Sequence, residues 1–215
     1  MRLRDAFRAG VSGSLVFNTR TDILSICEVL QAEVAPALLI KDRRKFHIRT
    51  YLAVVENPFL EDKLEVYIFN RHEVRIAGVP VPINDNDSRD PPSHITNGAL
   101  SNTTERVLLH NIEELTSRGL QEKTELFVAE TFGKHLIPDM SRRVQYGGAI
   151  PYGTIHKFAV AGLDLMVTEA NRMYFLEVNV NPAAPPEDTV DESFKTHLEG
   201  FLHDLVDLVV GKPMP

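Results

Sequence analysis

The sequence predicts an α+β protein whose sheet consists mainly of antiparallel strands. Residues 45–56 (KFHIRTYLAVVE) alternate between apolar and polar side chains, which is typical of a strand with one buried face. Two further pairs of strand patterns, within 64–78 and 160–180, are each joined by a short polar connection and predict hairpins. Helical periodicity follows the first hairpin and closes the chain. We therefore expect a mixed or antiparallel sheet with flanking helices.

The elements before and between the hairpins follow from caps and periodicity. SLVF (14–17) predicts a short strand, and Thr21 or Asp22 begins a helix with apolar residues at helical spacing. Helices are also expected over 103–119, which ends at a glycine, and over 122–136.

The remaining segments are a loop and a closing helix. The proline-rich segment 79–93 predicts a loop. The last helix is expected to begin at Thr189, where Glu192 completes a capping-box pattern. Gly211 and Pro213 end that helix.

Composition excludes several classes of protein. The chain has 215 residues, 43% of them hydrophobic, and no apolar run is long enough to cross a bilayer. The N-terminal MRLRDAFRAG has no apolar segment after its arginines, so we expect no signal peptide. A single cysteine excludes an internal disulfide framework. A net charge of −7 argues against nucleic acid as a partner. We expect a cytoplasmic protein with no membrane partner.

Polar side chains interrupt the last predicted strand, FLEVNVNP (175–182). If it pairs with the preceding strand about a turn centred between Ala170 and Asn171, Asp164 faces Glu177 and Asn179 lies one strand step further. Two facing carboxylates repel each other, so a cation is expected between them. Mg²⁺ prefers such oxygen ligands and usually shares them with phosphates. The three side chains predict a magnesium site that accepts a nucleotide.

Two alternatives stay open at this point. Lys157 or a strand arginine could neutralise the carboxylates in a purely structural salt-bridge network. Lys45, His47 and Arg49 share one face of a predicted strand and suit phosphate or carboxylate binding, but a solvated sheet face explains the same pattern.

Four segments together resemble the tubulin tyrosine ligase-like family. RRKFHIRTYLAVV (43–55), HITN (94–97), GLDLMV (162–167) and YFLEVNVNP (174–182) stand in the family's order and are similar to its KFDIR, HLTN, GFDFM and LLEVN. The resemblance covers roughly residues 25–205. The family belongs to the ATP-grasp superfamily, in which the nucleotide lies between two α+β subdomains.

The resemblance implies a domain organisation. Residues 1–40 would be part of the small ATP-grasp subdomain, and residues 41–215 would be the C-terminal subdomain that binds metal and phosphate. The resemblance also implies that the family's N-terminal domain is absent from this chain.

The resemblance also assigns roles to residues. Asp164, Glu177 and Asn179 would hold Mg²⁺ against the phosphates of ATP, and Arg49 would contact the γ-phosphate or an acyl phosphate. The implied catalytic residues are Arg49, His47 and Asn97, and the implied nucleotide-binding residues are Gln31, Ala32, Glu33, Val34, Lys45 and Thr96. Within the segment VLQAEV (29–34), the backbone from Ala32 to Val34 would meet the purine.

The sequence departs from the family pattern in several places. His47 stands where the family usually has aspartate, and Ala32 stands where lysine is common. No lysine closely follows HITN, and the chain has no tryptophan. These departures bear on catalysis, because histidine does not carry the negative charge of a carboxylate at neutral pH.

The resemblance implies an ATP- and Mg²⁺-dependent carboxylate–amine ligase. Such an enzyme joins an amino acid of the tyrosine, glutamate or glycine class to a protein carboxylate through an acyl phosphate, with tubulin as one candidate acceptor. The main alternative is a catalytically degenerate relative that binds a nucleotide or a protein partner. A further alternative is an ATP-grasp ligase that acts on a small peptide.

Overall fold

The computed structural model describes part of the chain. The described residues are 34–40, 42–56, 64–82, 93, 96, 104–136, 158–180, 182 and 192–210. The strand predicted at 14–17 and the helix predicted after residue 21 lie outside them.

The described residues fall into two compact units. Unit 1 holds those within Met1–His47, Val74–Arg106 and Met166–Tyr174, and unit 2 holds those within Ile48–Glu73, Val107–Leu165 and Phe175–Pro215. The subdomain boundary expected at residue 40 stays a prediction.

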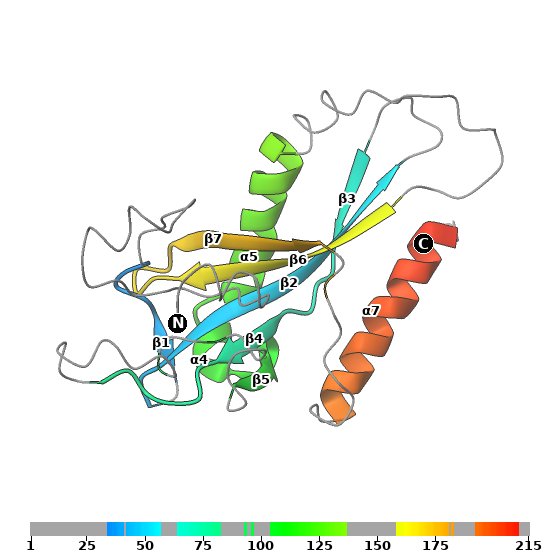
Figure 1. The fold of residues 1–215 in the computed structure, drawn as a ribbon. Coiled ribbons are helices and arrows are strands. Elements are labelled where there is room, and N and C mark those ends of the chain that lie inside the picture. The colour runs from blue at the N-terminus through cyan, green and yellow to red at the C-terminus, as the bar shows by residue number, and fades with distance from the viewer. Residues whose placement is uncertain are drawn as a thin grey trace, which may run out of the picture. The chain divides into compact units, whose positions relative to one another are not determined.

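Seven strands form one hydrogen-bonded sheet (Figure 1). They are β1 (Leu39–Ile40), β2 (Arg44–Glu56), β3 (Leu64–Ile68), β4 (Glu73–Ile76), β5 (Glu105–Leu108), β6 (Phe158–Val167) and β7 (Met173–Val180). The strand order is β5-β4-β2-β6-β7, and β1 and β3 also pair with β2. Strand β2 pairs with β1, β3 and β6 in antiparallel register. The predicted α+β class with antiparallel pairing is therefore confirmed.

The helices follow the expected positions more closely at the end of the chain than in the middle. The described helices are η2 (Leu109–Asn111), α4 (Glu113–Thr116), α5 (Leu120–Val128), the π-helix η3 (Ala129–Leu136) and α7 (Glu192–Val210). The last of these is described as far as Val210, and its predicted end at Gly211 lies outside the described residues. None of the helices in the described part of the chain is long and apolar enough to cross a membrane.

Two elements differ from the sequence-based expectation. The helix predicted over 103–119 was wrong in its first half, because residues 105–108 form β5 beside β4 and helical structure begins only at Leu109. Pairing with the sheet overrides the helical spacing of a short apolar run.

The hairpin predicted within 64–78 was also wrong. Its two strands do not pair with each other: β3 pairs with the second half of β2, at residues 52–56, while β4 lies between β5 and β2. Strand β2 has 13 residues and is long enough to accept both neighbours in succession. The connection at residues 69–72 therefore links two strands that each use β2 as partner.

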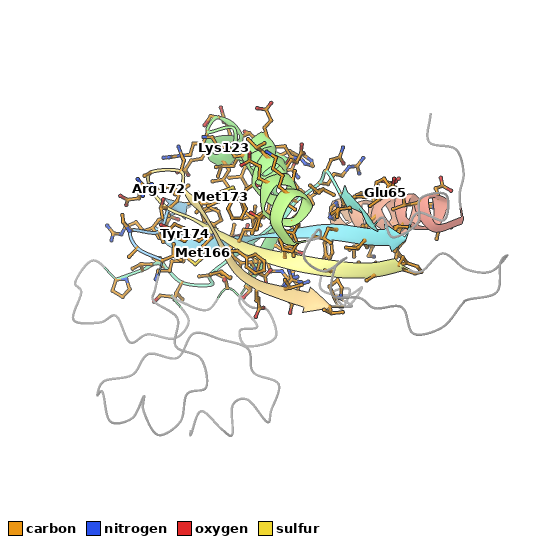
Figure 2. The ribbon with its side chains drawn as sticks, turned by 90° about the horizontal axis from the view of Figure 1, so that it is seen from above. Glu65, Lys123, Met166, Arg172, Met173 and Tyr174 are labelled. Atoms are coloured by element: carbon orange, nitrogen blue, oxygen red, sulfur yellow. The ribbon has the colours of Figure 1, made fainter. Side chains whose placement is uncertain are left out.

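The connection between β6 and β7 is a three-residue turn (Figure 2, near the label of Arg172). The Thr168 amide donates to the Arg172 carbonyl, and the Asn171 amide donates to the Thr168 carbonyl. Asn171 has φ of 57°, a left-handed conformation that asparagine tolerates in turns. Thr168 and Arg172 therefore pair across a three-residue loop, 169–171, whereas the sequence predicted a connection centred between Ala170 and Asn171.

Strand β2 presents two faces within unit 2. Ile48 lies opposite Leu165 and Thr50 lies opposite Leu163, and these side chains are fully buried on one face. The intervening Arg49 lies opposite Asp164 on the other face. The alternation seen in the sequence therefore separates an apolar core from a polar surface of the same strand.

Helix α7 packs on unit 2 through its aromatic and histidine side chains. The ring of Phe201 lies 5.0 Å from that of Tyr51 and 5.3 Å from that of Phe69, measured between centroids. His197 is fully buried, with its ring 5.1 Å from Phe69. A compact group of rings thus holds the helix against Tyr51 and Phe69.

A second buried histidine lies behind β2. His72 is fully buried, its Nδ1 lies 2.8 Å from the Thr50 hydroxyl, and its Nε2 lies 3.8 Å from the Glu125 carboxylate. Burial, followed by the charge of nearby His197, lowers the pKa of His72 to about 4. Burial also lowers the pKa of His197 to about 4. The charge of Glu73 raises this pKa, whereas the charges of Arg71 and His110 lower it further.

We expect acid to destabilise the protein through these two histidines. Their pKa values in the folded state lie below the ordinary value of 6.5, so the unfolded state binds protons first as the pH falls. Their contribution to stability is complete above about pH 6.5 and is lost between pH 6.5 and about 4, by up to roughly 1.4 kcal/mol per pH unit for each histidine. Chemical unfolding across this range measures the slope.

His72→Gln should reduce that slope, because it removes one of the two buried titrating groups. His203→Gln is the matched control, since His203 lies on α7 with an exposed side chain. An identical slope for the wild type and His72→Gln would contradict this account.

Candidate active site

The candidate site lies on the polar face of three neighbouring strands in unit 2, β2, β6 and β7 (Figure 1). Strand register places Arg49 directly opposite Asp164. Glu177 and Asn179 come from β7, two residues apart, so their side chains leave the same side of that strand. The sheet therefore brings together four polar side chains from three segments of the sequence.

Arg49 and Asp164 form a buried, bidentate ion pair. Arg49 Nε donates to Asp164 Oδ1, and Arg49 Nη2 donates to Asp164 Oδ2 at 2.7 Å. The two side chains are only 6% and 7% exposed. A planar guanidinium fits a carboxylate in this way and fixes the orientation of both groups. The salt-bridge alternative allowed a strand arginine beside these carboxylates, and Arg49 is such an arginine, paired with Asp164.

Asn179 joins the two carboxylates. Its Nδ2 donates to Asp164 Oδ2 at 3.1 Å and to Glu177 Oε1 at 3.1 Å. The two carboxylates that the sequence grouped with Asn179 as metal ligands thus both lie within hydrogen-bonding distance of its amide. Their role in binding a metal stays a prediction.

Negative charge is only partly balanced in this group. Burial raises the pKa of the Glu177 carboxyl above its usual value, and the neighbouring Asp164 carboxylate raises it further. The Asn179 amide and the Arg49 charge act in the opposite direction without cancelling the effect. An additional positive group beside Glu177 would therefore stabilise its ionised form.

The donor set is compatible with magnesium. Among the described residues, no group of three or more His, Cys, Asp and Glu side chains is placed to hold a metal. The predicted set differs, because it has two carboxylates and one amide, and Mg²⁺ commonly takes only one or two protein carboxylates beside water and phosphate. Turning the Asn179 amide by 180° would present its oxygen in place of the nitrogen that now contacts both carboxylates.

Several of the predicted site residues belong to unit 1. Lys45 and His47 are buried, at 8% and 5% exposure, and His47 Nδ1 lies 2.5 Å from the Thr96 hydroxyl. Val34 is half-buried. The structure brings His47 and Thr96 together, and the roles predicted for them stay predictions. The other predicted residues, Gln31, Ala32, Glu33 and Asn97, lie outside the described part of the chain.

Sequence reasoning missed one buried carboxylate near this face. Glu73 is fully buried in unit 2, and its Oε2 accepts a hydrogen bond of 3.4 Å from the Tyr51 hydroxyl. The alternation of β2 placed Tyr51 on the face of Arg49, but nothing in the sequence indicated that Glu73 would reach it.

Comparison with known proteins agrees with these motifs. The model of the tubulin-tyrosine ligase family matches residues 29–212. A probable tubulin–tyrosine ligase of Schizosaccharomyces pombe is 25% identical over an aligned length of 177 residues, and the alignment covers 79% of this chain. The chain spans 40% of the length of that relative. Since the family match covers well over half of its residues, the chain belongs to the tubulin-tyrosine ligase family.

Proposed function

We propose that this chain forms the phosphate- and metal-binding part of an ATP-dependent carboxylate–amine ligase. The observation that carries the proposal is the group of Arg49, Asp164, Glu177 and Asn179 on one sheet face, in a chain of this family. The fold proposed for it is an ATP-grasp, with residues 1–40 in the small subdomain and 41–215 in the C-terminal one.

Each residue has a task that its geometry supports. The Asp164 carboxylate accepts hydrogen bonds from Nε and Nη2 of Arg49. The third guanidinium nitrogen, Nη1, would then contact a phosphate oxygen. Asp164, Glu177 and the Asn179 amide would hold Mg²⁺, which when bound neutralises charge on the transferred phosphoryl group. His47 and Thr96 would lie by the phosphates, and Lys45 would contact the nucleotide.

The proposed reaction joins an amino acid to a protein carboxylate through an acyl phosphate. The γ-phosphoryl group passes to the carboxylate oxygen and ADP leaves; the amine then attacks the carbonyl and phosphate leaves. The amino acid belongs to the tyrosine, glutamate or glycine class, and tubulin is a candidate acceptor, as the name of the fission-yeast relative suggests. We place the reaction in the cytoplasm.

A second candidate is a relative that binds a nucleotide or a protein partner without catalysis. One observation favours it: His47 stands where the family usually has aspartate, and its Nδ1 lies against the Thr96 hydroxyl. At neutral pH an imidazole cannot supply the negative charge of a carboxylate. Binding without turnover separates this candidate from the ligase.

Calorimetric titration with ATP tests the nucleotide and metal site. We expect ATP to bind more tightly with Mg²⁺ than without it. Glu177→Gln should weaken Mg²⁺-dependent binding roughly 10- to 100-fold, because it removes one proposed ligand charge.

Glu199→Gln is the matched control, since it removes the same charge from an exposed position on α7. That variant should bind as the wild type does. Magnesium-independent binding, or equal losses in both variants, would count against the proposed site.

The same substitution should stabilise the protein without ligand. Because the folded-state pKa of Glu177 lies above its usual value, the ionised carboxylate opposes folding at neutral pH. Glu177→Gln should therefore raise the free energy of unfolding at pH 7, and the gain should disappear as the pH falls below about 4, where glutamate is neutral in both states. Urea unfolding at several pH values measures this. A less stable variant at pH 7 would show that the charge instead supports the fold.

A further inference from the structure

Gly162 lies beneath the side chain of Arg49. It faces Tyr51 across the β2–β6 pair and precedes Asp164 by two residues, so both point to the polar face. A Cβ atom placed on Gly162 would lie 3.0 Å from Arg49 Nη1 and 3.1 Å from Arg49 Cδ. It would also lie 3.1 Å from Pro182 Cβ. The space above this backbone is therefore occupied from two sides.

The backbone of Gly162 does not itself require glycine. Among the described glycines, only Gly119 has a positive φ, of 66°, whereas Gly162 lies within a regular antiparallel pair. Glycine inside a strand weakens it, because it packs no side chain and loses more conformational entropy on folding. Close approach of another group is the remaining reason for glycine at such a position. Here the approaching group is Arg49.

We propose that Gly162 is a positioning residue for Arg49. Its missing side chain forms a slot in which Arg49 lies flat across β6, reaches Asp164 with Nε and Nη2, and presents Nη1 at a fixed height above the strand. This inference rests on the proposed function, in which Arg49 contacts a phosphate. The new element is that the distance between the Arg49 guanidinium and the backbone of β6 depends on the absence of a methyl group at Gly162.

The expected response to a methyl group at Gly162 follows from the atoms that it would meet. Contacts of 3.0–3.1 Å to Nη1, Cδ and Pro182 Cβ are shorter than the roughly 3.5–4.0 Å at which such atoms pack. Because Cδ is affected as well as Nη1, we expect the outer part of the Arg49 side chain to shift by a few tenths of an ångström. Such a shift would disturb the two bonds to Asp164, and Pro182 limits the room on the other side.

A double-mutant cycle tests the slot. Gly162→Ala is made in the wild type and in an Arg49→Ala/Asp164→Asn background, where both charges are removed together so that neither is left buried alone. We expect Gly162→Ala to lower the urea midpoint of unfolding clearly more in the wild type than in that background. Gly133→Ala is the control, since nothing lies within 4 Å of the Cβ it would add.

A purely structural role for Gly162 would give equal shifts in both backgrounds, and that result would overturn the proposal. If Gly162→Ala does not fold alone, recovery of folding in the Arg49→Ala/Asp164→Asn background supports the slot, and failure to fold in both overturns it.

Titration with Mg²⁺ and ATP supplies the second readout. Where Gly162→Ala folds, its affinity should fall several-fold, but it should cause no further loss in the Arg49→Ala/Asp164→Asn background. The double-mutant cycle on unfolding needs no nucleotide. It can therefore distinguish failure of the proposed slot from failure of the proposed function. Coupling without ATP binding by the wild type would refute the proposed function and leave the slot intact, whereas ATP binding without coupling would refute the slot.

Discussion

The buried pair of Arg49 and Asp164 organises the candidate site. Two charges at 6% and 7% exposure are stable only while each has its partner, and removal of one member of such a pair typically costs roughly 3–5 kcal/mol. The pair joins β2 to β6, and the Asn179 amide then ties Asp164 to Glu177 on β7. A continuous chain of hydrogen bonds therefore links Arg49 on β2 to Glu177 on β7.

The negative charges of the site are only partly offset by its own residues. Arg49 offsets one carboxylate, while Glu177 remains with a raised pKa because it is partly buried beside Asp164. In the proposed function a bound cation would offset this unfavourable charge. Under that proposal, the stability of the free protein and its affinity for the cation would oppose each other at Glu177.

Much of this arrangement was predictable from the sequence, but not all of it. Period-two alternation placed Lys45, His47 and Arg49 on one face of β2, and it grouped Glu177 with Asn179. Pairing could not be predicted as well: β3 and β4 look like a hairpin locally, yet each pairs with β2. Register is set by turn geometry and by partners distant in sequence, which a local pattern does not contain.

Other features could not be predicted from local sequence patterns, because they also depend on residues distant in sequence. Residues 105–108 have helical spacing and become a strand because the sheet offers them a partner. Gly162 carries no side chain, so only the path of Arg49 above it reveals its part in the site. The Tyr51–Glu73 contact likewise joins residues 22 positions apart.

A crystal structure with Mg²⁺ and a non-hydrolysable ATP analogue tests the central claim most directly. The account predicts a magnesium ion at about 2.0–2.1 Å from oxygens of Asp164, Glu177 and Asn179, with the amide turned and Arg49 Nη1 on a phosphate oxygen. Nucleotide bound away from this face, with the Asn179 nitrogen still donating to both carboxylates, would contradict it.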